Sequence, residues 1–187
     1  MAKNNFNFTL TFRNQLKALE FSLVIFVFTM GCMLYFSYSD PSFRIEIFAW
    51  LFAIQLVPVL YLHFEYLLIN RGSSFNVNID LSILKYTKNR EEVILQFDQI
   101  GKIVLYLPPS AFGGLILRKM QFLPVEAYGY AVIYSKEGDK FVVTSLLVPD
   151  VYKEFEKING IQMDKKKRVF ASPSVEPIIQ WFKKDGL

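Results

Sequence analysis

Two long apolar runs dominate the first seventy residues. Residues 21–39 contain no charged side chain, and residues 47–64 form a second uncharged run. At about 1.5 Å per residue, a helix over the first run covers about 28 Å, close to the ~30 Å hydrocarbon core of a bilayer. Residues 40–44 between the runs are too few for a domain. The pattern predicts a transmembrane hairpin with helices at about 21–39 and 45–69, since so small a protein could hardly cover two core helices on all sides.

From residue 74 onward the apolar period changes to two, which is typical of strands with one buried face. Strands are predicted near residues 74–79, 82–87, 93–97, 102–107, 125–135 and 140–145. Val151, Phe155 and Ile158 then share one face of a predicted helix that begins at Pro149-Asp150 and ends at Asn159-Gly160. Strands in this order, followed by one helix, predict a small antiparallel barrel or sandwich whose open end the helix covers.

The stretch from Phe6 to Phe12 also alternates between apolar and polar residues, which predicts a strand before the hairpin. A lone strand is not stable in water. We therefore expect it to join an edge of the soluble sheet. The alternative is a helix that lies on the membrane surface through its Phe side chains.

Charged residues are distributed unevenly along the chain. Residues 1–70 hold 8 of the 38 charged residues, although they make up more than a third of the chain. This split divides the sequence into an N-terminal segment at 1–20, the hairpin at 21–69, a β domain at 70–160 and a basic tail at 161–187. The organisation is that of an apolar membrane part joined to a soluble part.

Lys and Arg counts orient the hairpin, because basic residues are enriched in cytoplasmic flanks. Three basic residues precede the hairpin and three follow it closely, whereas the connecting turn carries only Arg44. We therefore expect both termini to lie in the cytoplasm. The single Cys32 agrees with a reducing compartment, since it leaves no disulfide framework. The flanking basic residues are Lys3, Arg13, Lys17, Arg71, Lys85 and Lys88.

Three stretches of the soluble part, taken in order, resemble the bacterial pleckstrin-homology-like (PH-like) membrane proteins. They are Phe97–Ile103, Tyr130–Tyr134 and Val143–Asp150, and Thr9–Phe12 is similar to the segment before the first helix in one branch. The resemblance implies an α+β membrane protein in which a two-helix hairpin precedes a PH-like antiparallel β domain with a C-terminal helix. It also implies a bacterial inner (cytoplasmic) membrane as the location. Inositol-lipid binding is not implied, because the first β hairpin lacks the expected basic spacing.

No catalytic constellation is visible in the sequence. It has no Gly-rich phosphate loop and no Cys–His nucleophile pair, and a single Cys with a single His argues against a metal site. We therefore expect no enzyme activity, cofactor or metal. His63 and Glu65 fall near the predicted cytoplasmic boundary, where polar side chains reach the membrane interface. The alternative is a proton or ion role for these two residues in a small transporter or membrane enzyme.

Two segments are candidates for binding. The tail carries Lys165, Lys166, Lys167 and Arg168, followed by an apolar patch at Trp181, which suits an anionic membrane surface. Alternatively, this tail is disordered or packs on the β domain. The loop at 108–123 has an apolar tip at Phe112, which enters the bilayer, docks a partner or covers the end of the barrel. Nucleic acid is not expected, because no groove-reading motif accompanies the basic run.

These observations favour a non-enzymatic, membrane-anchored adaptor or assembly module. The hairpin would hold the β domain at the membrane, where it presents a sheet edge or a loop to a protein partner or to a second copy of the chain. The alternative is sensing of anionic lipid through the basic tail.

Overall fold

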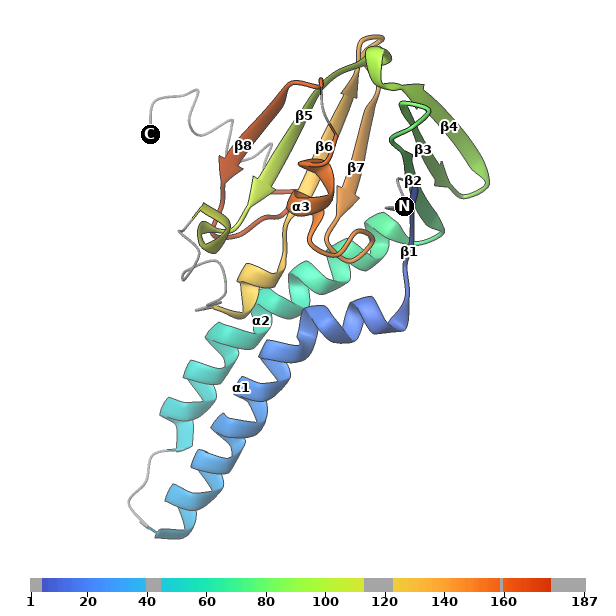
Figure 1. Ribbon diagram of the computed structural model, residues 1–187. Helices are drawn as coiled ribbons and strands as arrows, with labels where there is room; N and C mark the ends of the chain where they lie inside the picture. The colour runs from blue at the N-terminus through green and yellow to red at the C-terminus, as the bar shows by residue number, and fades with distance from the viewer. Residues whose placement is uncertain (1–4, 40–44, 113–122, 159, 176–187) are drawn as a thin grey trace.

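The helical hairpin leaves the β domain between two neighbouring strands and projects away from it (Figure 1). The computed structural model describes residues 5–39, 45–112, 123–158 and 160–175. Within these residues two four-stranded sheets and a short helix form the β domain. The fold class is therefore α+β, as the sequence predicts.

The two helices of the hairpin are α1 (Phe12–Ser39) and α2 (Ile45–Asn70), and both are long and apolar enough to cross a membrane. They pack on each other at Phe26 and Phe52, whose ring centroids lie 5.1 Å apart. Helix α1 begins nine residues before the predicted start at residue 21. The reason is an N-cap that the apolar pattern does not reveal, since the Asn14 amide donates to Thr11 Oγ1 at 3.2 Å.

The first sheet contains β1 (Asn5–Thr9), β2 (Ser73–Asn78), β3 (Ile83–Lys88) and β4 (Glu91–Gln96), in that order and antiparallel. The prediction that the N-terminal strand joins a sheet edge is confirmed, since β1 pairs with β2 from Asn5↔Asn78 to Thr9↔Ser74. The hairpin lies between these two paired strands. Both sheets apart from β1 follow the hairpin in sequence, as predicted, and β1 adds one strand of the domain before it.

The second sheet contains β5 (Ile100–Leu107), β6 (Tyr130–Ser135), β7 (Lys140–Thr144) and β8 (Met163–Lys167), in the order β7-β6-β5-β8. Strand β8 runs parallel to β5, and the other pairs are antiparallel. The basic segment is thus partly a sheet strand, which corrects the description of residues 161–187 as a tail. Among the residues that the structure describes, short 3₁₀ helices join the strands at η1 (Phe97–Gln99), η2 (Pro109–Phe112) and η4 (Pro124–Ala127).

The main core lies between the two sheets and is closed by α3 (Val151–Phe155). This helix ends at Phe155 rather than near Ile158, yet Val151, Phe155 and Ile158 are all buried, so the predicted apolar face is confirmed. Phe155 stacks on Phe75 of β2 with ring centroids 5.6 Å apart. The helix therefore covers the barrel end through the residues that the sequence indicated.

A second core lies on the opposite face of the second sheet, where α2 packs. Val59, Leu62 and Tyr66 of α2 are completely buried there. Their partners on β5 and β6 include Tyr106 and Tyr130. The last turns of α2 and the first turns of α1 thus pack on the β domain, whereas the far part of the hairpin projects from it (Figure 1).

Candidate functional site

The first candidate site is the junction between α2 and the β domain. His63 Nδ1 and Tyr128 Oη share a hydrogen bond of 3.0 Å, and Tyr66 Oη donates to the Ala171 carbonyl at 2.6 Å. The rings of Tyr66 and Tyr128 also contact edge to face at 5.4 Å. Burial raises the pKa of the Tyr128 phenol, so this hydroxyl stays protonated at neutral pH.

Two further polar contacts complete the junction. Asn70 Nδ2 donates to Thr144 Oγ1 at the end of β7, and both residues are fully buried. Glu65 Oε1 accepts a hydrogen bond from the Ser174 amide at 2.7 Å. With His63, these residues bind α2 to segments of the β domain. The side chains of His63 and Glu65 are therefore buried within the protein and do not snorkel as the sequence predicts.

The second candidate site is the basic strand β8 at the edge of the second sheet. Alternation along the strand divides the predicted basic run between two faces. Lys165 turns toward α3, where its Nζ lies 2.8 Å from Glu156 Oε1 and 4.7 Å from the Tyr152 ring centroid. Lys166 points to the opposite face.

That opposite face combines basic and aromatic side chains. Lys166 Nζ lies 3.5 Å from Tyr106 Oη and 5.3 Å from the centre of its ring, and Arg168 Cζ lies 5.8 Å from the same ring centre. The Tyr106 ring in turn stacks on Tyr130 at 4.5 Å with an interplanar angle of 8°. Because both tyrosines belong to the core that contacts α2, the cations and the membrane-type helix meet on one face of the sheet.

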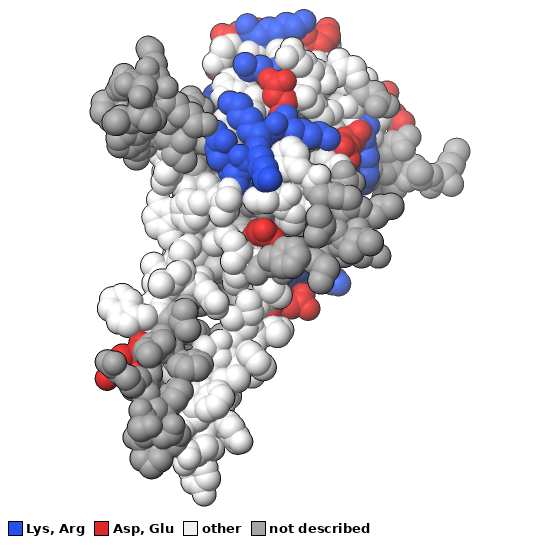
Figure 2. Space-filling view, turned by 90° about the vertical axis from the view of Figure 1, so that its left-hand side faces the viewer, with Lys and Arg blue, Asp and Glu red and all other residues white. Residues whose placement is uncertain are grey.

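Lys and Arg side chains gather on the β8 side of the β domain, above the apolar stem of the hairpin (Figure 2). Lys165 and Lys167 are exposed, and Lys166 and Arg168 are half-buried. Asp164 lies on the same face as Lys166 and reduces the local positive charge. The patch is therefore a mixed surface with a basic excess rather than a uniformly positive one.

The remaining predicted binding residues are less informative. Phe112 ends η2 and is 43% exposed, while the loop residues that follow it lie outside the described part of the chain. Trp181 also lies outside the described residues. Within the described ranges, no group of three potential metal ligands occurs.

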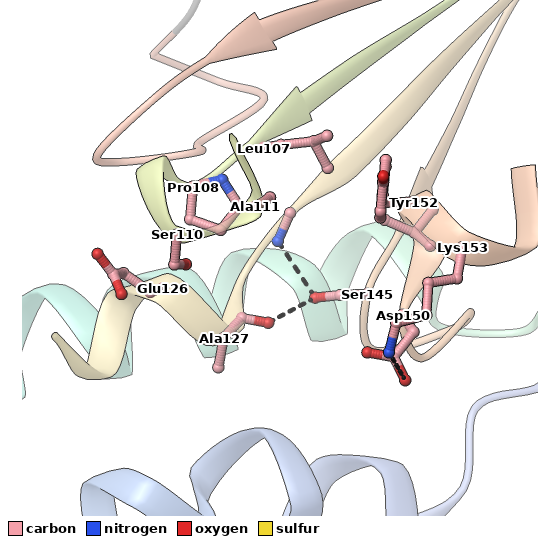
Figure 3. A pocket seen from close by; sticks show the side chains of 12 residues that line it. Leu107, Pro108, Ser110, Ala111, Glu126, Ala127, Ser145, Asp150, Tyr152 and Lys153 are labelled. Carbon is pink, nitrogen blue, oxygen red and sulfur yellow. Dashed lines mark hydrogen bonds and ion pairs between the residues drawn. The ribbon is translucent and has the colours of Figure 1, made fainter. Parts of the chain in front are cut away.

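A cavity of about 160 Å³ opens at the end of the barrel between η2, η4 and α3 (Figure 3). Ser145 Oγ accepts from the Gly129 amide at 3.3 Å and donates to the Ala127 carbonyl at 3.2 Å. Asp150 forms an ion pair with Lys153 at 3.5 Å. Among the described residues that line this cavity, none is a histidine or a cysteine. These polar contacts link η4, the start of β6 and the segment before α3 at the barrel end.

The family model described as a PH domain matches residues 7–158. The chain belongs to the PH-domain family. The match begins inside β1 and extends past α3, so it covers the hairpin as well as most of both sheets. No curated protein and no solved structure matches the chain. Membership of this family indicates a module for protein or lipid interaction.

Sequence reasoning missed the tyrosine pair on the helix-facing side of this PH domain. A signal was present, because Ile103–Leu107 is continuously apolar or aromatic rather than alternating. Such a run is typical of a strand that is buried on both faces. The packing of α2 on this face, together with residues near η4 such as Val125, explains that burial.

Proposed function

We propose that this chain is a membrane-anchored, non-enzymatic PH domain that acts as an adaptor or assembly module for a protein partner. The observation that carries the proposal is the insertion of two long apolar helices between the paired strands β1 and β2. Large apolar side chains are exposed along both helices. In water, so extended an apolar surface would promote aggregation, whereas in a bilayer it contacts lipid.

The length of the hairpin supports a complete crossing. From Glu20 to Ser39, helix α1 rises about 28 Å at ~1.5 Å per residue. Phe26 and Phe52 are in contact and mark a common height on the two helices. Tyr61 then lies about 13 Å above Phe52, and Glu20 lies about 9 Å above Phe26. The boundary of the hydrocarbon core accordingly passes near Glu20 on α1 and just below Tyr61 on α2.

The orientation follows from the basic residues near this boundary. Arg13 and Lys17 precede it on α1, and Arg71 follows α2. Positive residues accumulate on the cytoplasmic side, so the PH domain and both termini face the cytoplasm of a bacterial cell. Because the two ends of the hairpin leave from paired strands, the domain is attached to the membrane at two adjacent points.

The surface offered to a protein partner is the part of the PH domain that faces away from the hairpin. Strand β4 is an edge strand there, and Ile94 on it is 55% exposed. Edge strands carry unpaired backbone groups that can accept a partner strand. The junction at His63 and Tyr128 holds this surface in a fixed relation to the membrane.

Site-specific photocrosslinking of the full chain in living cells tests the adaptor role. A photoreactive phenylalanine at Ile94 should give one discrete protein adduct, whereas the same residue at Leu34, an exposed residue of the hairpin, should not give that adduct. An adduct whose mass equals that of two copies of this chain would identify the partner as a second copy. Absence of discrete adducts at Ile94, Gln96 and Glu92 would contradict an interaction surface on β4.

Recognition of anionic lipid is the second candidate function. The specific observation that favours it is the basic excess on β8, next to the stem of the hairpin (Figure 2). Basic residues near an anionic bilayer contribute about 1 kcal/mol each to binding. The two functions are compatible, because β4 and β8 belong to different sheets.

A further inference from the structure

The chain that leaves β8 returns directly to the membrane-type helix. The Arg168 amide donates to the Leu107 carbonyl at 2.8 Å, which extends the pairing of β8 with β5 by one residue. Two residues later, Phe170 stacks on Tyr61 of α2, with ring centroids 5.8 Å apart and an interplanar angle of 29°. Val169, which lies between Arg168 and Phe170 in the sequence, is 57% exposed. The basic end of β8 is therefore fixed next to α2.

This contact sets the height of the basic residues above the bilayer. Heights along the two helices can be compared by counting residues from the contact between Phe26 and Phe52. On this scale Tyr61 lies about 4 Å above Glu20, where the hydrocarbon boundary is expected. The Phe170–Tyr61 pair thus lies where aromatic side chains are enriched in membrane proteins. Arg168 and Lys166 follow on the side away from the hydrocarbon core, at the level of lipid headgroups.

We propose that Lys166 and Arg168, together with Tyr106, form a site for the phosphate of an anionic phospholipid whose acyl chains lie along α2. The inference rests on the proposed membrane insertion of the hairpin. An arginine guanidinium and a lysine ammonium are complementary to a phosphodiester. The Phe170–Tyr61 pair supplies the adjacent apolar contact that a lipid offers and a free phosphate does not.

The two faces of β8 are not equivalent in this site. Lys166 and Arg168 share the face that contains Tyr106, on the side where α2 packs. Lys165 lies on the other face and is paired with Glu156. Asp164 shares the first face and lies two residues before Lys166, farther from the membrane end of the strand. The geometry therefore predicts that charge on one face matters more than the total charge of the strand.

The test uses the full chain with Cys32→Ser and with Val169→Cys carrying a fluorescent label, reconstituted in phosphatidylcholine nanodiscs. A small fraction of the lipid is phosphatidylglycerol or phosphatidylcholine, spin-labelled on the acyl chain near the glycerol, so that it quenches a label at the membrane surface. We expect the anionic probe to be about five-fold more effective than the neutral one, the factor that one basic residue contributes near an anionic surface.

Two double variants that each remove two positive charges distinguish a specific lipid site from general electrostatic attraction to the membrane. Lys166→Gln with Arg168→Gln should remove the preference for phosphatidylglycerol. Lys165→Gln with Lys167→Gln, on the same strand but the opposite face, should preserve most of it. Equal losses in the two double variants would overturn the proposed site and indicate diffuse electrostatics. Equal quenching by the two lipids in the unmodified strand would overturn it as well.

Membrane insertion is tested separately in the same samples. If alkaline carbonate releases the chain from membranes, the proposed hairpin insertion fails, and the lipid site fails with it. If the chain stays in the membrane and the label at residue 169 shows no anionic preference, only the lipid site fails. Inorganic phosphate at millimolar concentration should not abolish the preference, and full competition by it would assign the site to a soluble phosphate instead.

Discussion

The imidazole Nδ1 of His63 lies 3.0 Å from the phenol oxygen of Tyr128, and this contact joins the hairpin to the β domain. His63 belongs to α2, whereas Tyr128 lies between η4 and β6, on the other side of the junction. Both residues are buried. The contact therefore joins α2 to the segment that leads from η4 into β6 of the second sheet.

Replacing Tyr128 with Phe should destabilise the protein by about 1–3 kcal/mol, because it leaves the His63 nitrogen buried without its partner. The measurement is the free energy of unfolding by denaturant in one detergent. Tyr38→Phe is the matched control, since Tyr38 is 93% exposed at the far end of α1. Equal effects of the two substitutions would contradict the importance of the contact.

The same reasoning addresses a transport role for His63. If the residue serves only the junction, Tyr128→Phe and His63→Ala should lower stability by comparable amounts, and their effects should be non-additive in the double variant. If the two effects are simply additive, the residues act independently. Stability of the three variants is compared in the same detergent.

Strand β1 should be required for the stability of the whole domain, although it is separated from β2 by the entire hairpin. Phe6 and Phe8 point toward the core side of the first sheet. Phe8 packs against the main core, and the centre of the Phe6 ring lies 4.4 Å from Lys157 Nζ. Phe6→Ser with Phe8→Ser should cost roughly 2–4 kcal/mol, given that a fully buried Phe contributes up to ~3 kcal/mol. Hydrogen exchange of the β2 amides should accelerate.

The control for this prediction lies on the other face of the same strand. Asn5 and Asn7 are exposed, so Asn5→Ser with Asn7→Ser should leave both exchange and stability nearly unchanged. If the two double variants behave alike, β1 does not hold the sheet through its Phe side chains.

Any side chain at Gly72 should destabilise the protein, because Gly72 turns the chain from α2 into β2 with φ of +68°. A Cβ there would also lie 2.9 Å from Asn89 Oδ1. Gly72→Ala should destabilise the protein by about 1–2 kcal/mol, the usual cost of a left-handed backbone for an L-residue. Gly101→Ala, whose Cβ would have only ordinary contacts beyond 3.4 Å, should cost clearly less. A larger loss at Gly101 would contradict this prediction.

Strands β2 and β3 could be predicted because each buries one face, so that apolar side chains recur with a period of two. Strand β8 could not be predicted in this way. Its Met-Asp-Lys-Lys-Lys sequence is held at a sheet edge by backbone pairing with β5, and only Met163 contributes to the core. Backbone pairing leaves no mark in the hydrophobic pattern.

The position of the hairpin between the paired strands β1 and β2 was only partly predictable. Alternation at Phe6 and Phe8 indicated a strand and an edge, but the choice of β2 as partner depends on where the two helices return to the domain. Likewise, His63 and Glu65 stand out as polar residues in an apolar helix. Their partners Tyr128 and Ser174 are distant in sequence, so burial at a junction could not be distinguished from a position at the membrane interface.

Cysteine accessibility is the most direct test of the central claim, that a PH domain carries a membrane-crossing hairpin between its first two strands. In a Cys32→Ser background, single cysteines at Ser42 and at Gly138 are exposed to a membrane-impermeant maleimide. We predict that Ser42→Cys is labelled in intact cells, and that Gly138→Cys is labelled only after the membrane is opened. Labelling of both positions from the same side of the membrane would contradict the account.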